Sequence, residues 1–86
     1  MADQNILLLL VSVKTKEKVL FEGTAETVTS FNLRGRFDIL PHHANFITLV
    51  SKYVIIDTGK ETERKFDIDK GILYAMSNRV SVYVGI

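Results

Sequence analysis

Cysteine is absent from this chain, and the 86 residues include one proline and two histidines. Without cysteine the chain has no disulfide, thiol nucleophile or thiolate metal site, which fits a reducing compartment. The five glycines are isolated from one another, so none of them forms the glycine-rich loop that holds a phosphate. These absences exclude several of the sites by which small enzymes are recognised.

The chain also lacks a predominance of one charge sign and a long apolar run. Basic and acidic residues are interspersed and give a net charge of +1, whereas a nucleic-acid site calls for a basic patch. The longest apolar run, Ile6–Val11, is far shorter than the roughly 20 residues that span a bilayer. It also lacks the basic flank and the cleavage site of a signal peptide. We therefore expect neither a nucleic-acid partner nor a membrane segment.

What the sequence does contain is period-two alternation, rich in β-branched and aromatic residues and broken by turn residues. No segment has a 3.6-residue apolar period of helical length. This pattern predicts an all-β antiparallel sandwich or barrel that forms a single domain over residues 1–86. The expected strands are Ile6–Val13, Lys18–Glu22, Ala25–Phe31, Asn45–Val50, Tyr53–Asp57, Glu63–Ile68, Gly71–Met76 and Arg79–Val84, the last two joined across Ser77-Asn78.

The first strand is apolar on both faces. If Leu7, Leu9, Val11 and Val13 face the core, Leu8 and Leu10 point the other way, where a half-exposed strand is normally polar. Two interpretations remain open. Either a loop or the second sheet covers Leu8 and Leu10, or they form part of a docking surface for another subunit.

Between two blocks of strand-like sequence lies Gly35–Phe46, which holds the proline and both histidines. Proline fixes φ and donates no hydrogen bond, so this segment is expected to be a loop. Within it we assign Phe37, Ile39, Leu40 and Phe46 to the core. The loop is the main candidate for a functional site.

His42 and His43, with Asp38 nearby, are the one candidate metal site. Zinc needs three or four ligands, and no further histidine or cysteine exists to complete the set. We expect one imidazole to bond to backbone and the other to face solvent or a partner. The serines lack a nucleophile elbow, and the paired carboxylates lie in charge-alternating stretches. The sequence therefore predicts no catalytic residue, no cofactor and no metal, and the chain is not expected to be an enzyme.

Three motifs, taken in order, resemble one family. Residues 13–23, VKTKEKVLFEG, are similar to I-V-T-P-E-K-V-L-F-E-G, and residues 35–43, GRFDILPHH, to G-E-F-G-I-L-P-G-H-A. Residues 69–74, DKGILY, and 78–82, NRVSV, are similar to S-G-G-F-L-E-V followed by N-K-V-T-V. Together they cover almost the whole chain, which resembles the amino-terminal β-sandwich domain of the epsilon subunit of F-type ATP synthases (delta in mitochondria).

The resemblance implies a sandwich of about ten short strands in two antiparallel sheets. It also implies a non-catalytic role in the central stalk, where the domain binds the gamma subunit and rests on the c-ring, coupling proton flow to ATP synthesis. The resemblance further implies a peripheral location at the cytoplasmic face of the energy-transducing membrane, most simply the bacterial plasma membrane. The domain would contact this membrane only through the rest of the complex. The family's carboxy-terminal helical hairpin is not expected here, since the sequence ends at Ile86.

The departures from the family pattern are concentrated near the loop. Arg34 and Arg36 stand where the family has acidic residues, beside the implied c-ring contact. Because like charges repel across an interface, we predict an acidic or neutral compensating residue on the partner. Asp38 and His42 stand where the family has glycine, as does Lys70.

These arguments lead to one expected interface and two alternatives. Residues assigned to contacts with the gamma subunit or the c-ring are Arg34, Arg36, His42, His43, Asn45 and, as an apolar patch, Leu8 and Leu10. The alternatives are a free-standing β-sandwich that binds a peptide or small ligand, and a small metal-dependent enzyme built on the two histidines.

Overall fold

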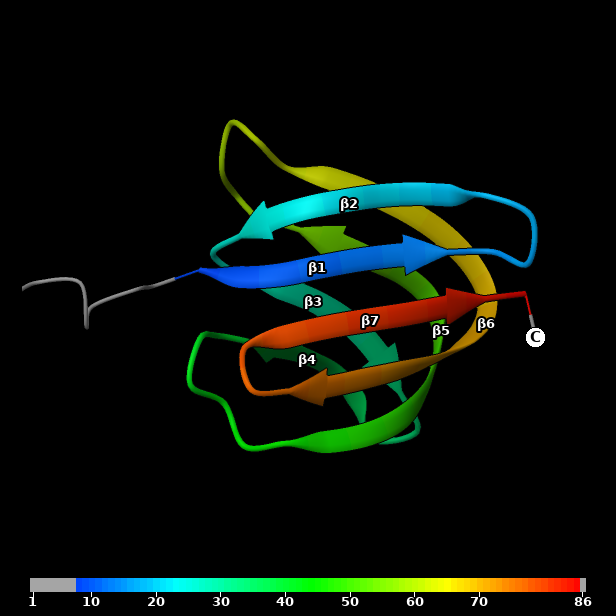
Figure 1. The fold of residues 1–86 in the computed structure, drawn as a ribbon. Helices are drawn as coiled ribbons and strands as arrows, with labels where there is room; N and C mark the ends of the chain where they lie inside the picture. Colours follow the sequence, from blue (N-terminus) through cyan, green and yellow to red (C-terminus); the bar gives the residue numbers. More distant parts are fainter. Residues whose placement is uncertain (1–7, 86) are drawn as a thin grey trace, which may run out of the picture.

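The computed structural model describes residues 8–85, and all of its regular elements are strands (Figure 1). None of these residues forms a helix that is long and apolar enough to cross a membrane. The seven strands are β1 (Leu9–Lys14), β2 (Val19–Ala25), β3 (Val28–Asn32), β4 (Gly35–Ile39), β5 (Phe46–Ile56), β6 (Arg64–Met76) and β7 (Arg79–Val84). The all-β prediction is confirmed.

The strands are hydrogen-bonded in one continuous order, β2-β1-β7-β6-β5-β3-β4. The expected pairing was wholly antiparallel, and this is wrong at one place, because β1 and β7 run parallel. Hairpin neighbours must be antiparallel, but β1 and β7 come from opposite ends of the described chain and are free of that restriction. A sandwich nevertheless results, since the long strands β5 and β6 curve around and turn the sheet onto itself (Figure 1).

The strand count also differs from the expected ten or so, since residues 8–85 form seven strands. Two expected breaks are absent, because β5 continues through 51–52 and β6 through 69–70. At both places the pairing of β5 with β6 shifts register, which is a β-bulge, and Lys52 adopts a positive φ of 73°. A bulge accommodates one extra residue and bends the strand without ending it. The chain therefore passes from one layer of the sandwich to the other by bending β5 and β6 at the bulge, and neither strand is interrupted.

The largest correction concerns Gly35–Phe46, whose first five residues form β4 and only the remainder a loop. β4 pairs with β3 from Asn32↔Gly35 to Val28↔Ile39. Leu33 and Arg34 make the two-residue turn between them, closed by a hydrogen bond from the Arg34 amide to Asn32 Oδ1 (2.8 Å). The short apolar alternation in this stretch was obscured by the proline and the turn residues that follow it.

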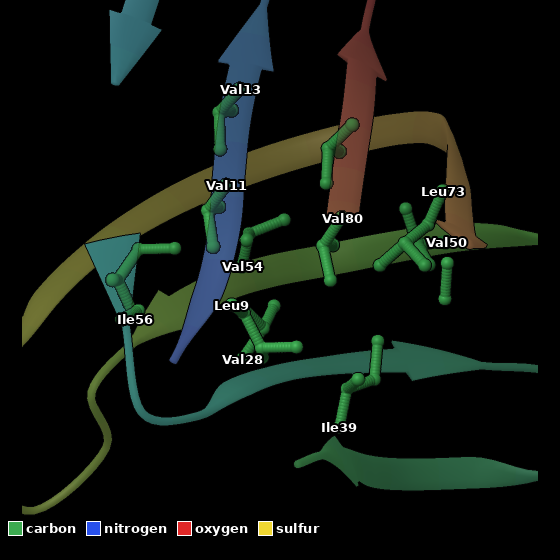
Figure 2. Close-up of a cluster of buried hydrophobic side chains, with 13 residues drawn as sticks. Leu9, Val11, Val13, Val28, Ile39, Val50, Val54, Ile56, Leu73 and Val80 are labelled. Atoms are coloured by element: carbon green, nitrogen blue, oxygen red, sulfur yellow. The ribbon is translucent and has the colours of Figure 1, made fainter. Parts of the chain in front are cut away.

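One hydrophobic core lies between the layers. Side chains from β1 and β7 meet side chains from β3, β4 and β5, strands that are not their neighbours in the sheet (Figure 2). Leu9, Val11 and Val13 are buried, as the alternation in the first strand predicts; Leu7 lies outside the described residues. Ile39 brings β4 into this core, and Phe37 and Phe46 pack against it with their rings 6.0 Å apart.

Leu40 does not join them. The prediction that it belongs to the core is wrong, since 53% of its surface is exposed. Strand residues alternate between faces, so the residue after the buried Ile39 points outward.

A polar cluster ties the β5–β6 turn to the β2–β3 connection. Asp57, which is buried, accepts hydrogen bonds from the Glu26 amide (2.6 Å) and the Thr62 hydroxyl (2.8 Å). Burial acts to raise the pKa of Asp57, but these hydrogen bonds and the attraction of Lys60 outweigh it and hold the pKa below its usual range. The cluster stabilises the fold at the same end of the sandwich as the last residue of β4, because Val28 pairs with both Ile39 and Ile56.

Candidate interaction surfaces

The β4–β5 loop is joined to the β6–β7 turn at one end of the sandwich. The His42 amide donates to Asn78 Oδ1 (2.5 Å), and the Ser77 amide donates to Asn45 Oδ1 (2.9 Å). The Leu10 amide reaches the same turn, donating to the Asn78 carbonyl (2.9 Å). The expected contact residues His42, Asn45 and Leu10 are thus brought together, although they lie far apart in the sequence. We call this region the loop end.

His42 and His43 are both exposed but play different structural parts. His42 has a φ of 69°, so the position where the family pattern has glycine keeps the left-handed conformation that glycine favours. Asp38, at another such position, lies in the extended strand β4. The ring of His43 lies within hydrogen-bond distance of the Ala44 carbonyl (Nδ1···O 2.9 Å) and 5.2 Å from the ring of Phe46. Within residues 8–85 no group of three or more potential ligands could hold a metal ion.

Arg34 and Arg36 do not belong to the loop end. Arg34 lies in the β3–β4 turn and Arg36 in the first half of β4, whereas the histidines follow the last residue of that strand. Both arginines are exposed. The structure therefore divides the expected contact residues into two groups at opposite ends of β4, and a single partner loop would not cover both.

Leu8 and Leu10 are exposed to 42% and 48%, so neither a loop nor the second layer covers them in the described part of the chain. Exposed Arg79 separates Leu10 from Met76 in the strand register, and beyond it lies a larger group of outward apolar residues that sequence reasoning missed. The strand register aligns these residues in two cross-strand rows. One row runs Leu49–Ile72–Tyr83 across β5, β6 and β7, and the neighbouring row contains Ile47 and Tyr74. We use the name apolar face for the following outer side chains: Leu8, Leu10, Ile47, Leu49, Ile72, Tyr74, Met76 and Tyr83.

Two features mark the apolar face as more than scattered surface residues. Leu49 is 64% exposed in the middle of a strand, and the rings of Tyr74 and Tyr83 meet edge to face at 5.8 Å. An open cleft of about 630 Å³ lies beside the two tyrosines and is also lined by Lys16. Monomeric proteins rarely expose a contiguous apolar surface without a binding role. The sequence signal was present, because Ile72, Tyr74 and Met76 alternate with buried apolar residues, as Leu8 and Leu10 do.

The comparisons with known proteins agree with this architecture. Residues 8–85 match the family described as ATP synthase, Delta/Epsilon chain, beta-sandwich domain. The ATP synthase epsilon chain of Clostridium botulinum (strain Alaska E43 / Type E3) is 31% identical over 75 residues, which cover 86% of this chain and 56% of that protein. That of Clostridium novyi (strain NT) is 34% identical over 73 residues, with 84% and 56% covered. The chain thus spans little more than half the length of these curated relatives.

Two solved structures share the fold. A chain of the Euglena gracilis mitochondrial ATP synthase, in a structure of OSCP, F1 and the c-ring, superposes with a TM-score of 0.78 at 9% identity, covering 88% of this chain and 49% of that one. A chain of the central stalk and c-ring of the Tetrahymena thermophila mitochondrial ATP synthase gives 0.71 at 12% identity, covering 91% and 63%. At such identities these likenesses concern the fold alone. With the family match over residues 8–85 and the two bacterial relatives, however, they leave one assignment: the chain belongs to the ATP synthase delta/epsilon chain β-sandwich family.

Proposed function

We propose that this chain is a non-catalytic subunit of the central stalk of a rotary F-type ATP synthase. In this role it couples the gamma subunit to the c-ring during proton-driven ATP synthesis. The proposal is supported by the family match over residues 8–85 and by relatives that are named ATP synthase epsilon chain. The structural observation that carries it is the apolar face, an exposed surface on a small sandwich whose core is already complete.

The two groups of contact residues suit two different partners. The apolar face and the adjoining loop end, with His42, His43 and Asn45, are assigned to the gamma subunit, because permanent interfaces are large and apolar at their centre. Arg34 in the β3–β4 turn and Arg36 in the first half of β4 are assigned to the c-ring, since a narrow charged turn fits a polar loop. A subunit with both contacts lies at the cytoplasmic face of the energy-transducing membrane and meets the lipid only through the complex.

Co-purification tests the assignment. The chain is tagged, expressed in cells that make the synthase from the same genome, and recovered from gently solubilised membranes. We expect the gamma subunit and the c subunit to be recovered with it. Recovery of the folded chain without either subunit would overturn the proposal. Genes for the synthase beta and gamma subunits immediately upstream would support it independently.

The cleft beside Tyr74 and Tyr83 favours one alternative, a free-standing module that binds a peptide or small ligand there. The two functions differ in a pull-down with purified gamma subunit. A stalk subunit binds gamma through the surface that contains the cleft, so gamma and a cleft ligand compete. A free-standing module binds its ligand and leaves gamma in solution.

A further inference from the structure

A second surface lies next to the apolar face, where the long strands bend. The strand register aligns Arg36 of β4, Phe31 of β3, Ser51 of β5 and Lys70 of β6 in one cross-strand row on the outer side of the sheet. Lys52 leans over the same row, with its Nζ 4.2 Å from the centre of the Phe31 ring. We call these five residues the basic row. Three of the five are cations, and none is acidic.

The position of Lys52 depends on an irregularity in the sheet. The pairing of β5 shifts register with β3 at Ser30/Phe31 and with β6 at Ser51/Lys52, so both sides of β5 are bulged at the same place. The buried Ser30 hydroxyl donates to the Tyr53 carbonyl (2.7 Å) and satisfies the backbone there. A bulge re-aims a side chain, and a non-glycine residue at positive φ is strained. The fold thus holds Lys52 beside Phe31 even though the positive φ of Lys52 strains the backbone.

The geometry of the basic row fits an extended segment. Neighbouring strands lie about 4.8 Å apart, so Arg36 and Lys70, three strand spacings from each other, are separated by about 14 Å. Alternate side chains of an extended chain repeat every ~6.6 Å. Three carboxylates on alternate residues therefore match the reach of Arg36, Lys52 and Lys70. Phe31, which is half-buried, offers an apolar contact between them.

We propose that the basic row binds an acidic, extended segment of a partner protein. A discrete segment fits better than a polyanion or a lipid surface, because Asp38 and Asp67 lie on the same outer side one row away and would repel a continuous negative charge. Arg36 is shared with the contact assigned to the c-ring, so the inference rests in part on the proposed function. It adds what that function leaves open, the chemistry of the partner at this place.

Photo-crosslinking in the assembled complex tests the proposal. The photoreactive residue p-benzoylphenylalanine is placed at position 51, in the centre of the basic row, or at position 53 if the first variant does not fold. After irradiation of cells the crosslinked peptide is identified by mass spectrometry. We expect a protein segment with at least two acidic residues. A neutral or basic segment, a lipid, a nucleic acid, or the absence of a product would overturn the inference.

Charge reversal supplies the matched comparison. The double variant R36E/K70E is expected to lower the crosslink yield at least about tenfold, because like charges across an interface cost several kcal/mol. K18E/R64E makes the same change in net charge at two exposed positions outside both the basic row and the apolar face, and it should leave the yield unchanged. Equal yields from both variants would count against the basic row. Co-purification with the synthase is scored separately, so a chain that assembles without an acidic crosslink refutes this inference alone.

Discussion

His42 and Asn78, which are 36 positions apart in the sequence, are joined by a hydrogen bond from the His42 amide to the Asn78 side chain. Asn78 also accepts a hydrogen bond from Leu10 through its carbonyl, and its own φ is 63°. One residue therefore fixes the loop, the hairpin turn and the start of the first strand. The loop end keeps its shape through hydrogen bonds from backbone amides to the Asn45 and Asn78 side chains, and both histidines remain exposed.

Replacing Asn78 separates its two roles. Asn78→Ala loses the acceptor for His42 and replaces asparagine by a residue that tolerates the left-handed conformation less well, so we expect the free energy of unfolding to fall by about 2 kcal/mol. Asn78→Gly keeps the backbone conformation and loses only the acceptor, for a loss of about 1 kcal/mol. Urea denaturation measures both. Equal losses in the two variants would show that backbone conformation contributes nothing here.

Asp57 makes the free energy of unfolding depend on pH in the acidic range. Its pKa in the folded state is below the ordinary value of 3.8, so the folded protein holds the ionised form more strongly than the unfolded chain does. The resulting stability is present above the unfolded pKa and is lost as the pH falls through the folded pKa. Asp57→Asn should therefore lower the free energy of unfolding by about 2 kcal/mol at neutral pH, since hydrogen bonds to a charged acceptor are lost.

The check is the difference between the original chain and the Asp57→Asn variant, followed from neutral pH to well below the ordinary pKa of the carboxyl group. Taking the difference removes the contributions of the other acidic residues. We expect it to be constant above the unfolded pKa and to shrink in stronger acid. A difference that stays constant throughout would mean that Asp57 titrates alike in both states.

Gly71 allows β6 and β7 to approach closely. A β-carbon built on it would lie 2.6 Å from the Tyr83 carbonyl oxygen, which is backbone and has little room to move. Gly71→Ala is therefore expected to cost about 2 kcal/mol of stability, the range of overpacked sites. Gly23→Ala is the matched control, because the nearest atom there is a Phe21 ring carbon at 3.4 Å. Its free energy of unfolding should change by less than about 0.5 kcal/mol. A similar loss in both would contradict the close approach.

Much of the fold follows from the sequence, because period-two alternation reports which face of a strand is buried. Val11 and Val13 in the first strand, and Val80 and Val82 in the last, are buried as that period requires. The hairpin across Ser77-Asn78 also forms, with both residues at positive φ. Local chemistry was sufficient in these places.

The errors occur where distant strands decide the outcome. Nothing local to Gly35–Ile39 shows that β3 offers a free edge, so the sequence predicts a loop where β4 forms. Lys52 resembles an ordinary strand end, and only its pairing with both neighbours makes it a bulge inside a longer strand. The apolar face likewise appears once the register places Leu49 beside Ile72 and Tyr83. Such information resides in the pairing of strands and not in any one of them.

The apolar face gives the sharpest test of the assignment to the gamma subunit. Leu49 is 64% exposed, so Leu49→Asp should change the free energy of unfolding by less than about 0.5 kcal/mol. In an apolar interface the same carboxylate must lose its hydration without a partner, and we expect affinity for purified gamma subunit to fall at least about tenfold. The matched control is Val19→Asp, at a residue of β2 that is 50% exposed and lies outside the apolar face. Its binding should equal that of the original chain. If Leu49→Asp binds gamma as tightly as Val19→Asp does, the gamma contact lies elsewhere on the sandwich.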